Sequence, residues 1–285
     1  MAPRLFCFGL GYSAGRLAQG LLGEGWRVAG TAREAARLAE LSEQGIETFA
    51  FDREHRLAPG ALDGTTHLLA SVPPDSQGDP ALDACTRAII AAKSSLEWVG
   101  YLSTTGVYGD YRGAWVDESS PLRPTSERAW RRVGAEVGWL DLQRLHGLPV
   151  HIFRLAGIYG PGRSPLDEVR AGTARRIVKR GQLFSRIHVE DIAAVLRASM
   201  RAPHPGAVYN VCDDEAAPPQ DVVAYACRLL GAAVPPEIPY EQAELSAMAQ
   251  SFWADNKRVR NTRMKQELGV SLAYPTYREG LRALL

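Results

Sequence analysis

The stretch RLFCFGLGYSAGRLAQGLL, residues 4–22, decides the fold. It starts with a short apolar run at residues 4–8, turns through Gly9 and Gly11, and continues with apolar residues at helical spacing. Glycines at these positions let the chain turn tightly and let the backbone approach a ligand, while the small Ala14 allows close packing of helix on strand. This strand, turn and helix with the pattern Gly-x-Gly-x-x-Ala predict a diphosphate site at a helix N-terminus.

The residues around this turn indicate which dinucleotide it binds. Tyr12 and Ser13 follow the second glycine, and their amides are expected to face the diphosphate. The second expected strand, residues 26–31, ends at Thr31 and is followed by Arg33, with no acid that could bind the ribose hydroxyls of NAD. The planar guanidinium of Arg33 can bind a 2′-phosphate, which favours NADP over NAD. A solvated loop arginine is the alternative.

Two further positions complete the predicted cofactor site. Asp52, after the third strand, can accept a hydrogen bond from the adenine amino group or cap a turn, and Ser71 ends the fourth strand. Residues 11–15 also match the Gly-x-Ser-x-Gly elbow of α/β-hydrolases. That elbow follows several strands, whereas only one strand precedes this segment, so we reject a hydrolase. A purely structural glycine turn remains an alternative.

Strands and helices alternate along the first part of the chain, which predicts right-handed crossovers and a parallel sheet covered on both faces. The expected strands are residues 4–8, 26–31, 47–51, 66–71, 98–103 and 150–155, and the expected helices are 13–22, 35–42, 80–94 and 127–145. Later we expect helices at 169–180, 191–201 and 220–230, an extended piece at 183–189, a strand at 207–211 and a final helix from Tyr277. The predicted fold class is therefore α/β, a Rossmann-type doubly wound parallel sheet with a smaller C-terminal substrate lobe.

Composition narrows the function classes. The 285 residues carry a formal net charge of +1, so no bulk field favours nucleic acid or an anionic membrane. No apolar run approaches the ~20 residues of a membrane helix, and the first apolar run breaks into glycines, unlike an export signal. The four cysteines are far apart and are expected to be free thiols. A cytoplasmic protein that binds neither nucleic acid nor membrane is expected.

The segment from His188 to Asp191 and the basic run at residues 257–263 each allow two interpretations. Neighbouring side chains on a strand point to different faces, so His188, Glu190 and Asp191 are not expected to bind a metal. Asp191 is expected to be a helix N-cap, and no metal site is predicted. The basic run is a solvated face or a site for a phosphorylated or acidic substrate.

Five segments, in order, make the chain similar to a known family. They are LSTTGVYGD at 102–110, DESSPLRP at 117–124, RLAGIYGPG at 154–162, RIHVED at 186–191 and PTYREGL at 275–281. With the glycine turn, they resemble the extended short-chain dehydrogenases/reductases, the NAD(P)-dependent epimerases and dehydratases, and in particular their atypical members.

The resemblance implies a discontinuous division of the chain. Residues 1–157 and about 183–211 would form the NADP-binding domain, and about 158–182 and 212–285 the substrate lobe. The cofactor would lie over the carboxyl ends of the strands, with a small-molecule substrate between the lobes. Family members often dimerise through two helices of the first domain, which leaves a homodimer open.

The resemblance also locates the catalytic residues, and two of them are missing. Thr104 matches the Ser or Thr that hydrogen-bonds the reacting oxygen. Glu136 matches an acid that follows the family's Tyr-x-x-x-Lys pair, which places Arg132 at the lysine and Arg128 at the tyrosine. An arginine keeps its proton at workable pH, so Arg128 cannot act as the acid/base. Arg132 can keep the cationic, ribose-binding part of the lysine's role.

A substitute proton donor would have to come from elsewhere. Tyr108 and Tyr111 are nearest to Thr104 in sequence, and Asp83 is the candidate for the family's Asn on the preceding helix. Two functions follow. One is an NADP-dependent reductase, epimerase or dehydratase acting on a small polar, sugar-nucleotide-like substrate. The sequence slightly favours this enzyme. The other is a non-catalytic NADP-binding sensor or regulatory protein.

Overall fold

The computed structural model describes residues 2–285, which cluster into two compact units. Unit 1 contains the chain up to Thr104 together with Trp130–Arg154 and Ala193–Tyr209. Unit 2 contains Thr105–Ala129, Leu155–Ile192 and Asn210–Leu285. Each unit is described by itself.

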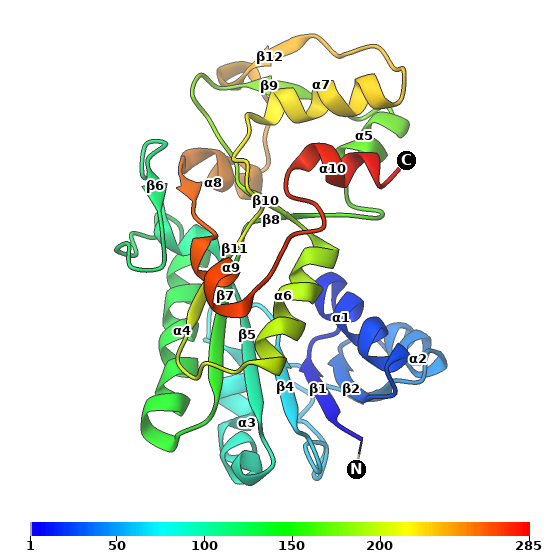
Figure 1. Ribbon diagram of the computed structural model, residues 1–285, viewed down its shortest axis with the longest axis vertical. Coiled ribbons are helices and arrows are strands. Elements are labelled where there is room, and N and C mark those ends of the chain that lie inside the picture. The colour runs from blue at the N-terminus through cyan, green and yellow to red at the C-terminus, as the bar shows by residue number, and fades with distance from the viewer. Residues whose placement is uncertain (1) are drawn as a thin grey trace. The chain divides into compact units, whose positions relative to one another are not determined.

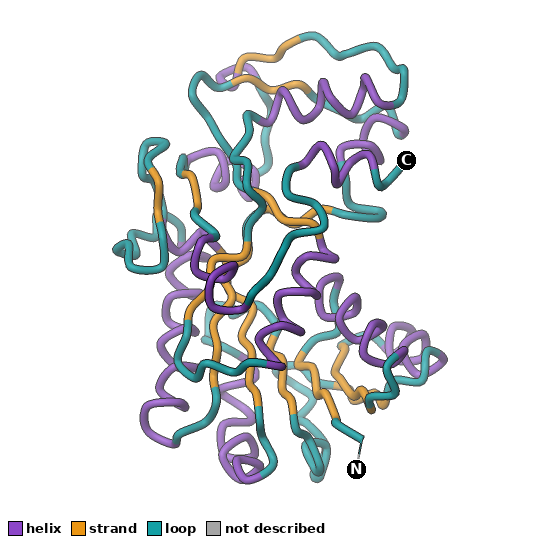
Figure 2. The backbone as a smooth tube through the Cα atoms, in the orientation of Figure 1, coloured by secondary structure: helices purple, strands orange, loops and turns teal. Residues whose placement is uncertain are grey.

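A parallel sheet forms the centre of unit 1 (Figure 1). Within the described residues it has seven strands in the order β11-β7-β5-β4-β1-β2-β3. The strands are β1 (Arg4–Phe8), β2 (Arg27–Ala32), β3 (Glu47–Ala50), β4 (His67–Ala70), β5 (Trp98–Thr104), β7 (Val150–Leu155) and β11 (Val208–Val211). The helices between them are α1 (Tyr12–Gly23), α2 (Ala35–Glu43), α3 (Pro80–Ala91), α4 (Glu127–His146) and α6 (Val189–Arg201), and the short 3₁₀ turn η1 (Ala92–Ser94) follows α3 (Figure 2). The predicted Rossmann-type fold is confirmed.

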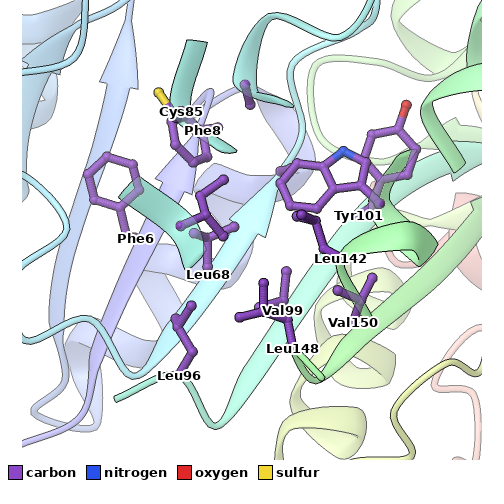
Figure 3. Packing of buried hydrophobic residues seen from close by; sticks show 14 of the residues in the cluster. Phe6, Phe8, Leu68, Cys85, Leu96, Val99, Tyr101, Leu142, Leu148 and Val150 are labelled. Atoms are coloured by element: carbon purple, nitrogen blue, oxygen red, sulfur yellow. The ribbon is translucent and has the colours of Figure 1, made fainter. Parts of the chain in front are cut away.

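One face of the sheet packs against α3 and α4. Alternate strand residues point to this face, because side chains of a strand alternate between its two sides. Phe6 and Phe8 of β1 and Val99 and Tyr101 of β5 belong to one buried cluster with Cys85 of α3 and Leu142 of α4 (Figure 3). Trp139 of α4 belongs to the same cluster. The nearly unbroken apolar strands therefore reflect a sheet that is buried on both sides.

The opposite face carries a row of aromatic rings. Trp98 lies between His67 of β4 and His151 of β7, with ring centroids 6.4 and 5.9 Å from its own. Its indole N–H donates to Ser199 Oγ of α6 at 3.0 Å. The amide of His204 donates to His151 Nε2 at 2.9 Å, so the ring proton of His151 sits on Nδ1, which faces the Val99 carbonyl at 3.3 Å. Both histidines are thus built into the core as neutral rings.

These two histidines should make the protein sensitive to acid. Burial lowers the pKa of His67 and of His151 to about 4, from an ordinary 6.5. The unfolded chain takes up protons below pH ~6.5 and the folded chain only near pH 4, so stability falls between these values, by about 3 kcal/mol per histidine at most. We expect His67→Gln/His151→Gln to lose less stability between pH 7.5 and 5 in urea unfolding. The control is His146→Gln, at an exposed histidine. If the double variant lost as much stability between pH 7.5 and 5 as this control, the assignment would be contradicted.

Unit 2 is built from short elements. They are the 3₁₀ turn η2 (Thr105–Tyr108), β6 (Trp115–Val116), β8 (Gly157–Tyr159), α5 (Pro165–Arg170), β9 (Arg176–Val178), β10 (Arg186–His188), α7 (Pro219–Leu229), β12 (Glu237–Pro239), η3 (Tyr240–Gln242), α8 (Ala247–Ala254), β13 (Arg258–Val259), α9 (Thr262–Leu268) and α10 (Tyr277–Arg282). Three two-stranded pairs, β10-β8, β12-β9 and β13-β6, occur among the described residues. A cluster around Leu166, Val222 and Leu281 forms an apolar core between α5, α7 and α10.

Several expectations for this region were wrong. The helix expected at 169–180 is α5, which begins earlier because Ser164 and Asp167 form a capping box with Pro165 at the first turn. It ends before Gly172, whose φ of +68° suits the left-handed conformation, and β9 follows. Helices α8 and α9 were not expected. The interpretation of Asp191 as an N-cap was also wrong, because α6 begins at Val189 and the Asp191 carboxylate accepts hydrogen bonds from the amides of Ala273 and Tyr274.

Each of the two units is made of separate stretches of the chain, with bounds that are not those of the expected domains, whose roles stay a prediction. Residues 105–129 cluster with unit 2, because β6 pairs with β13, and the returning segment is Ala193–Tyr209 rather than about 183–211. All four cysteines are buried and unpaired. In the described chain, none of the helices has the length and apolar character needed to cross a bilayer.

Candidate functional site

Hydrogen bonds hold both the backbone N–H and the carbonyl oxygen of Gly9. Its amide donates to Thr31 Oγ1 at 2.9 Å, and its carbonyl accepts from Ser71 Oγ at 2.6 Å. Its φ is +83°, and a Cβ here would lie 2.9 Å from Val72 Cγ2. Three strand ends, of β1, β2 and β4, therefore fix one turn. Thr31 and Ser71, predicted as cofactor residues, are the two side chains that hold the turn between β1 and α1, and their contact with a cofactor stays a prediction.

Gly11 leaves the space that a dinucleotide needs. It occupies the N-cap of α1, no side chain caps that helix, and a Cβ added at Gly11 would have nothing within 4 Å. Ala14, one turn into the helix, is 1 % exposed, while Tyr12 is 36 % exposed. A helix N-terminus without a side-chain cap and with a bare backbone in front of it suits a diphosphate. The residues present therefore fit a bound NAD(P).

The second strand brings the expected ribose end close to this turn. Gly30 packs against Leu10, and a Cβ at Gly30 would lie 2.4 Å from Leu10 Cδ1, so only glycine fits between β2 and the turn. Arg33 follows β2 and is exposed. Asp52 accepts hydrogen bonds at Oδ1 from the amides of Glu54 and His55, which lower its pKa. This bonding favours the turn-capping alternative for Asp52, and its contact with adenine stays a prediction.

Thr104 is the last residue of β5 and is partly buried. Its neighbour Ser103 points to the opposite face and donates from Oγ to Glu136 Oε1 of α4 at 2.5 Å. Arg154 of β7 holds the same carboxylate, with Nη2 2.7 Å from Oε2 and Nε 3.1 Å from Oε1. All three residues of the Ser103–Glu136–Arg154 network are 5 % exposed or less. The network ties the strand that carries Thr104 to α4 and β7.

Arg132, at the lysine position, turns toward β5. Its Nη1 donates to the Leu102 carbonyl at 2.7 Å and to Tyr101 Oη at 3.0 Å, and its guanidinium carbon lies 5.6 Å from the Tyr101 ring centre. Tyr101 is fully buried and stacks on Trp139. One nitrogen of Arg132 therefore braces α4 against β5. Its predicted contact with the ribose stays a prediction.

Two of the other predicted catalytic residues have partners within unit 2. Arg128, at the tyrosine position, is exposed, and its guanidinium carbon lies 5.7 Å from the ring centre of Phe252. Tyr108 is fully buried and donates from Oη to Asn210 Oδ1 at 2.8 Å. Asn210 is held in turn by Glu118, whose Oε1 accepts a hydrogen bond from the backbone N–H of Asn210 at 2.7 Å. This packing favours a structural role for Tyr108, and its role as proton donor stays a prediction.

Asp83, the candidate for the family's Asn, belongs to a surface ion-pair cluster in unit 1. Arg53 binds it at 2.6 Å and also binds Asp75 at 2.8 Å. The Arg53 guanidinium lowers the pKa of Asp75 to about 2. Asp83 also lines a cavity of about 1110 Å³ between α3 and the chain that follows β3. The ion pair with Arg53 favours a structural role for Asp83, and its catalytic role stays a prediction.

The sequence interpretation did not include Ser103 or Arg154 in the site. Both lie inside quoted motifs, Ser103 directly before Thr104 and Arg154 at the start of RLAGIYGPG. A serine, a glutamate and an arginine that all fall at buried positions signal a paired network, because a buried charge needs a partner. Within residues 2–285, the His, Cys, Asp and Glu side chains do not form a cluster of three or more that could hold a metal ion.

A family comparison agrees with this geometry. The sequence model of the "NAD dependent epimerase/dehydratase family" matches residues 9–212, which are most of the chain. The chain belongs to this family. Protein YeeZ of Escherichia coli K12 is 30 % identical over 281 residues, covering 94 % of each chain.

Solved structures agree on the fold. A functionally unknown conserved protein from Silicibacter pomeroyi is 54 % identical, with a TM-score of 0.91 over 99 % of this chain and 98 % of that one. The dTDP-glucose 4,6-dehydratase of Bacillus anthracis, solved with NAD, has a TM-score of 0.76 at 17 % identity and covers 99 % and 94 %. The UDP-glucuronic acid 4-epimerase of Bacillus cereus, also with NAD, has a TM-score of 0.77 at 16 % identity and covers 98 % and 96 %.

Proposed function

We propose that this family member binds NADP(H) and acts as an oxidoreductase, epimerase or dehydratase on a small polar, sugar-nucleotide-like substrate. The observation that carries the proposal is the turn at Gly9 and Gly11, which presents bare backbone at the uncapped N-terminus of α1. When bound, the nicotinamide would supply or accept a hydride. The amides of α1 would hold the diphosphate, and Arg33 would pair with the 2′-phosphate.

The choice of NADP depends on Arg33. The two sugar-nucleotide enzymes named above were solved with NAD, so the fold alone does not select NADP. In this chain an exposed arginine follows β2, and the first acid after β2 is Glu34, the N-cap residue of α2, which makes no side-chain capping bond. A guanidinium paired with a phosphate is a charge-assisted contact worth about 1.5–3 kcal/mol.

We expect Arg33→Ser to weaken NADPH binding by about 10- to 100-fold and to leave NADH binding unchanged. Fluorescence titration of both nucleotides measures this. Arg37→Ser is the matched control, because Arg37 lies in the first turn of α2, has a side chain that is 41 % exposed and pairs with Glu40 at 2.9 Å. Equal losses of NADPH and NADH affinity in Arg33→Ser would contradict the assignment of NADP.

In the proposed reaction, Thr104 orients the reacting oxygen from the end of β5 by a hydrogen bond. The proton comes from a donor other than the family's tyrosine, because arginines stand at both positions of the Tyr-x-x-x-Lys pair. We expect Thr104→Val to lower turnover by about a hundredfold, the typical loss for one such donor. NADPH oxidation against a panel of carbonyl compounds and sugar nucleotides measures it. Thr86→Val is the control, because the Thr86 hydroxyl bonds within α3, to Leu82.

A second function has its own supporting observation. Arg132 donates to Tyr101 and Leu102, so the residue in the lysine position braces the protein itself. That bonding favours a non-catalytic NADP-binding sensor or regulatory protein. The same panel separates the two functions. Tight NADPH binding with no oxidation by any substrate would support the sensor, and oxidation that Thr104→Val lowers about a hundredfold would support the enzyme.

A further inference from the structure

The parallel strands β6 and β13 form a small two-stranded ribbon in unit 2. Trp115 is the register partner of Arg258, and Val116 is the partner of Val259. The two valines are buried, at 1 % and 4 % exposure, whereas Trp115 is 45 % exposed. Because strand side chains alternate, Trp115 and Arg258 share the outer face, and Arg260, two residues after Arg258, continues it.

Both arginines converge on the same indole. The guanidinium carbon of Arg258 lies 5.8 Å from the centre of the Trp115 ring, and that of Arg260 lies 5.0 Å from it. A guanidinium held over an aromatic ring is oriented by cation–π attraction. Its N–H donors lie in the guanidinium plane and stay available for an acceptor that approaches from solvent. The outer face of the ribbon thus presents two oriented guanidinium groups.

The acids around the ribbon are engaged elsewhere. Asp117 accepts from both the amide and the hydroxyl of Ser119, and Asp255 pairs with Lys257 at 3.3 Å. Across residues 2–285, no carboxylate lies within ion-pair distance of Arg258 or Arg260, and both side chains are exposed. In a chain of net charge +1, these two neighbouring guanidiniums are a local excess of positive charge.

We propose that the Trp115–Arg258–Arg260 surface binds the phosphoryl groups of a small phosphorylated molecule. Phosphate oxygens match the planar fork of a guanidinium, and a diphosphate offers oxygens on two phosphorus atoms to two forks. A small ligand is favoured over a nucleic acid, because the nearly neutral chain lacks the extended basic face that a nucleic acid needs. This site belongs to unit 2 and does not depend on the nucleotide turn at Gly9, which belongs to unit 1.

The test uses inorganic pyrophosphate as the probe, titrated into the full-length protein by calorimetry at low salt. We expect Arg258→Gln/Arg260→Gln to remove one binding site or to weaken it at least tenfold. Arg282→Gln, which changes an exposed arginine paired with Glu279 in the same unit, should leave binding unchanged. Pyrophosphate that also occupies the turn at Gly9 would bind both variants equally, so the difference between them reports on the ribbon alone.

A second variant tests the geometry rather than the charge. Trp115→Leu keeps both arginines and removes the ring that orients them, and we expect pyrophosphate binding at least fivefold weaker, with an unchanged circular dichroism spectrum. Pyrophosphate binding that is the same in wild type, Arg258→Gln/Arg260→Gln and Trp115→Leu would overturn the proposal. If a labelled single-stranded oligonucleotide bound the wild type at physiological salt and did not bind the double arginine variant, the choice of a small ligand would be overturned.

Discussion

Replacing Gly11 with valine should abolish NADPH binding while the protein stays folded. Gly11 has φ of −82° and ψ of −164°, which valine adopts without strain, and a Cβ there meets no protein atom within 4 Å. The added side chain would instead project into the space in front of the α1 amides. Because a diphosphate must approach that backbone closely, we expect affinity to fall at least ~100-fold, about 2.7 kcal/mol.

The control for this prediction is Gly23→Val, at the other end of α1. Gly23 is exposed, and a Cβ there also meets nothing within 4 Å. Both variants should melt within a few degrees of wild type, and only Gly11→Val should lose NADPH in a fluorescence titration. Wild-type affinity in Gly11→Val would mean that the nucleotide does not lie against this turn, and the proposed function would then lose its main support.

Sequence reasoning located the first βαβ unit well because its signals are local. The predicted strands and helices from residue 4 to residue 51 agree with β1 through β3 to within one residue. Alternating apolar runs and glycine stops decide such elements over short distances. The parallel sheet then followed from the alternation itself, since consecutive strands joined by helices give parallel neighbours.

The partners of polar side chains could not be predicted in this way. Arg132 was expected to keep a cationic role toward the ribose, but one of its nitrogens bonds to the Leu102 carbonyl and to Tyr101 Oη. Spacing along α4 aligns Arg132 with the family's lysine, yet spacing does not say which acceptors the sheet offers beneath the helix. Tyr108 is a similar case, because its partner Asn210 lies about a hundred residues away.

The bounds of the two units differ from the expected domain bounds for the same physical reason. Residues 105–129 follow β5 directly, so continuity along the chain favoured the first domain. The two-residue strand β6 pairs with β13, more than 140 residues later, and this carries the segment into unit 2. A pairing of so few residues leaves no periodic pattern in the sequence. The start of α5 is a different case, because the Ser164–Asp167 capping box that sets it is a local sequence pattern and could have been predicted.

Removing the carboxylate of Glu136 should be among the most destabilising changes in unit 1. Glu136→Ala would leave the Arg154 guanidinium buried without its bidentate partner, and Ser103 Oγ without its acceptor. Breaking one side of a buried pair costs about 3–5 kcal/mol, because the remaining charge stays out of water. Denaturant unfolding at neutral pH measures this loss. The control Glu40→Ala, in the exposed pair with Arg37, should cost under about 1 kcal/mol.

The double variant Glu136→Leu/Arg154→Leu separates the value of the pair from the cost of a stranded charge. Two apolar side chains leave no buried ion, so we expect the double variant to be more stable than Glu136→Ala. Because the network holds β5 at Ser103, the residue before Thr104, the double variant should still bind NADPH but turn over more slowly than wild type. A Glu136→Ala variant no less stable than Glu40→Ala would show that Arg154 finds water or another partner, and the network would then not be what fixes the end of β5.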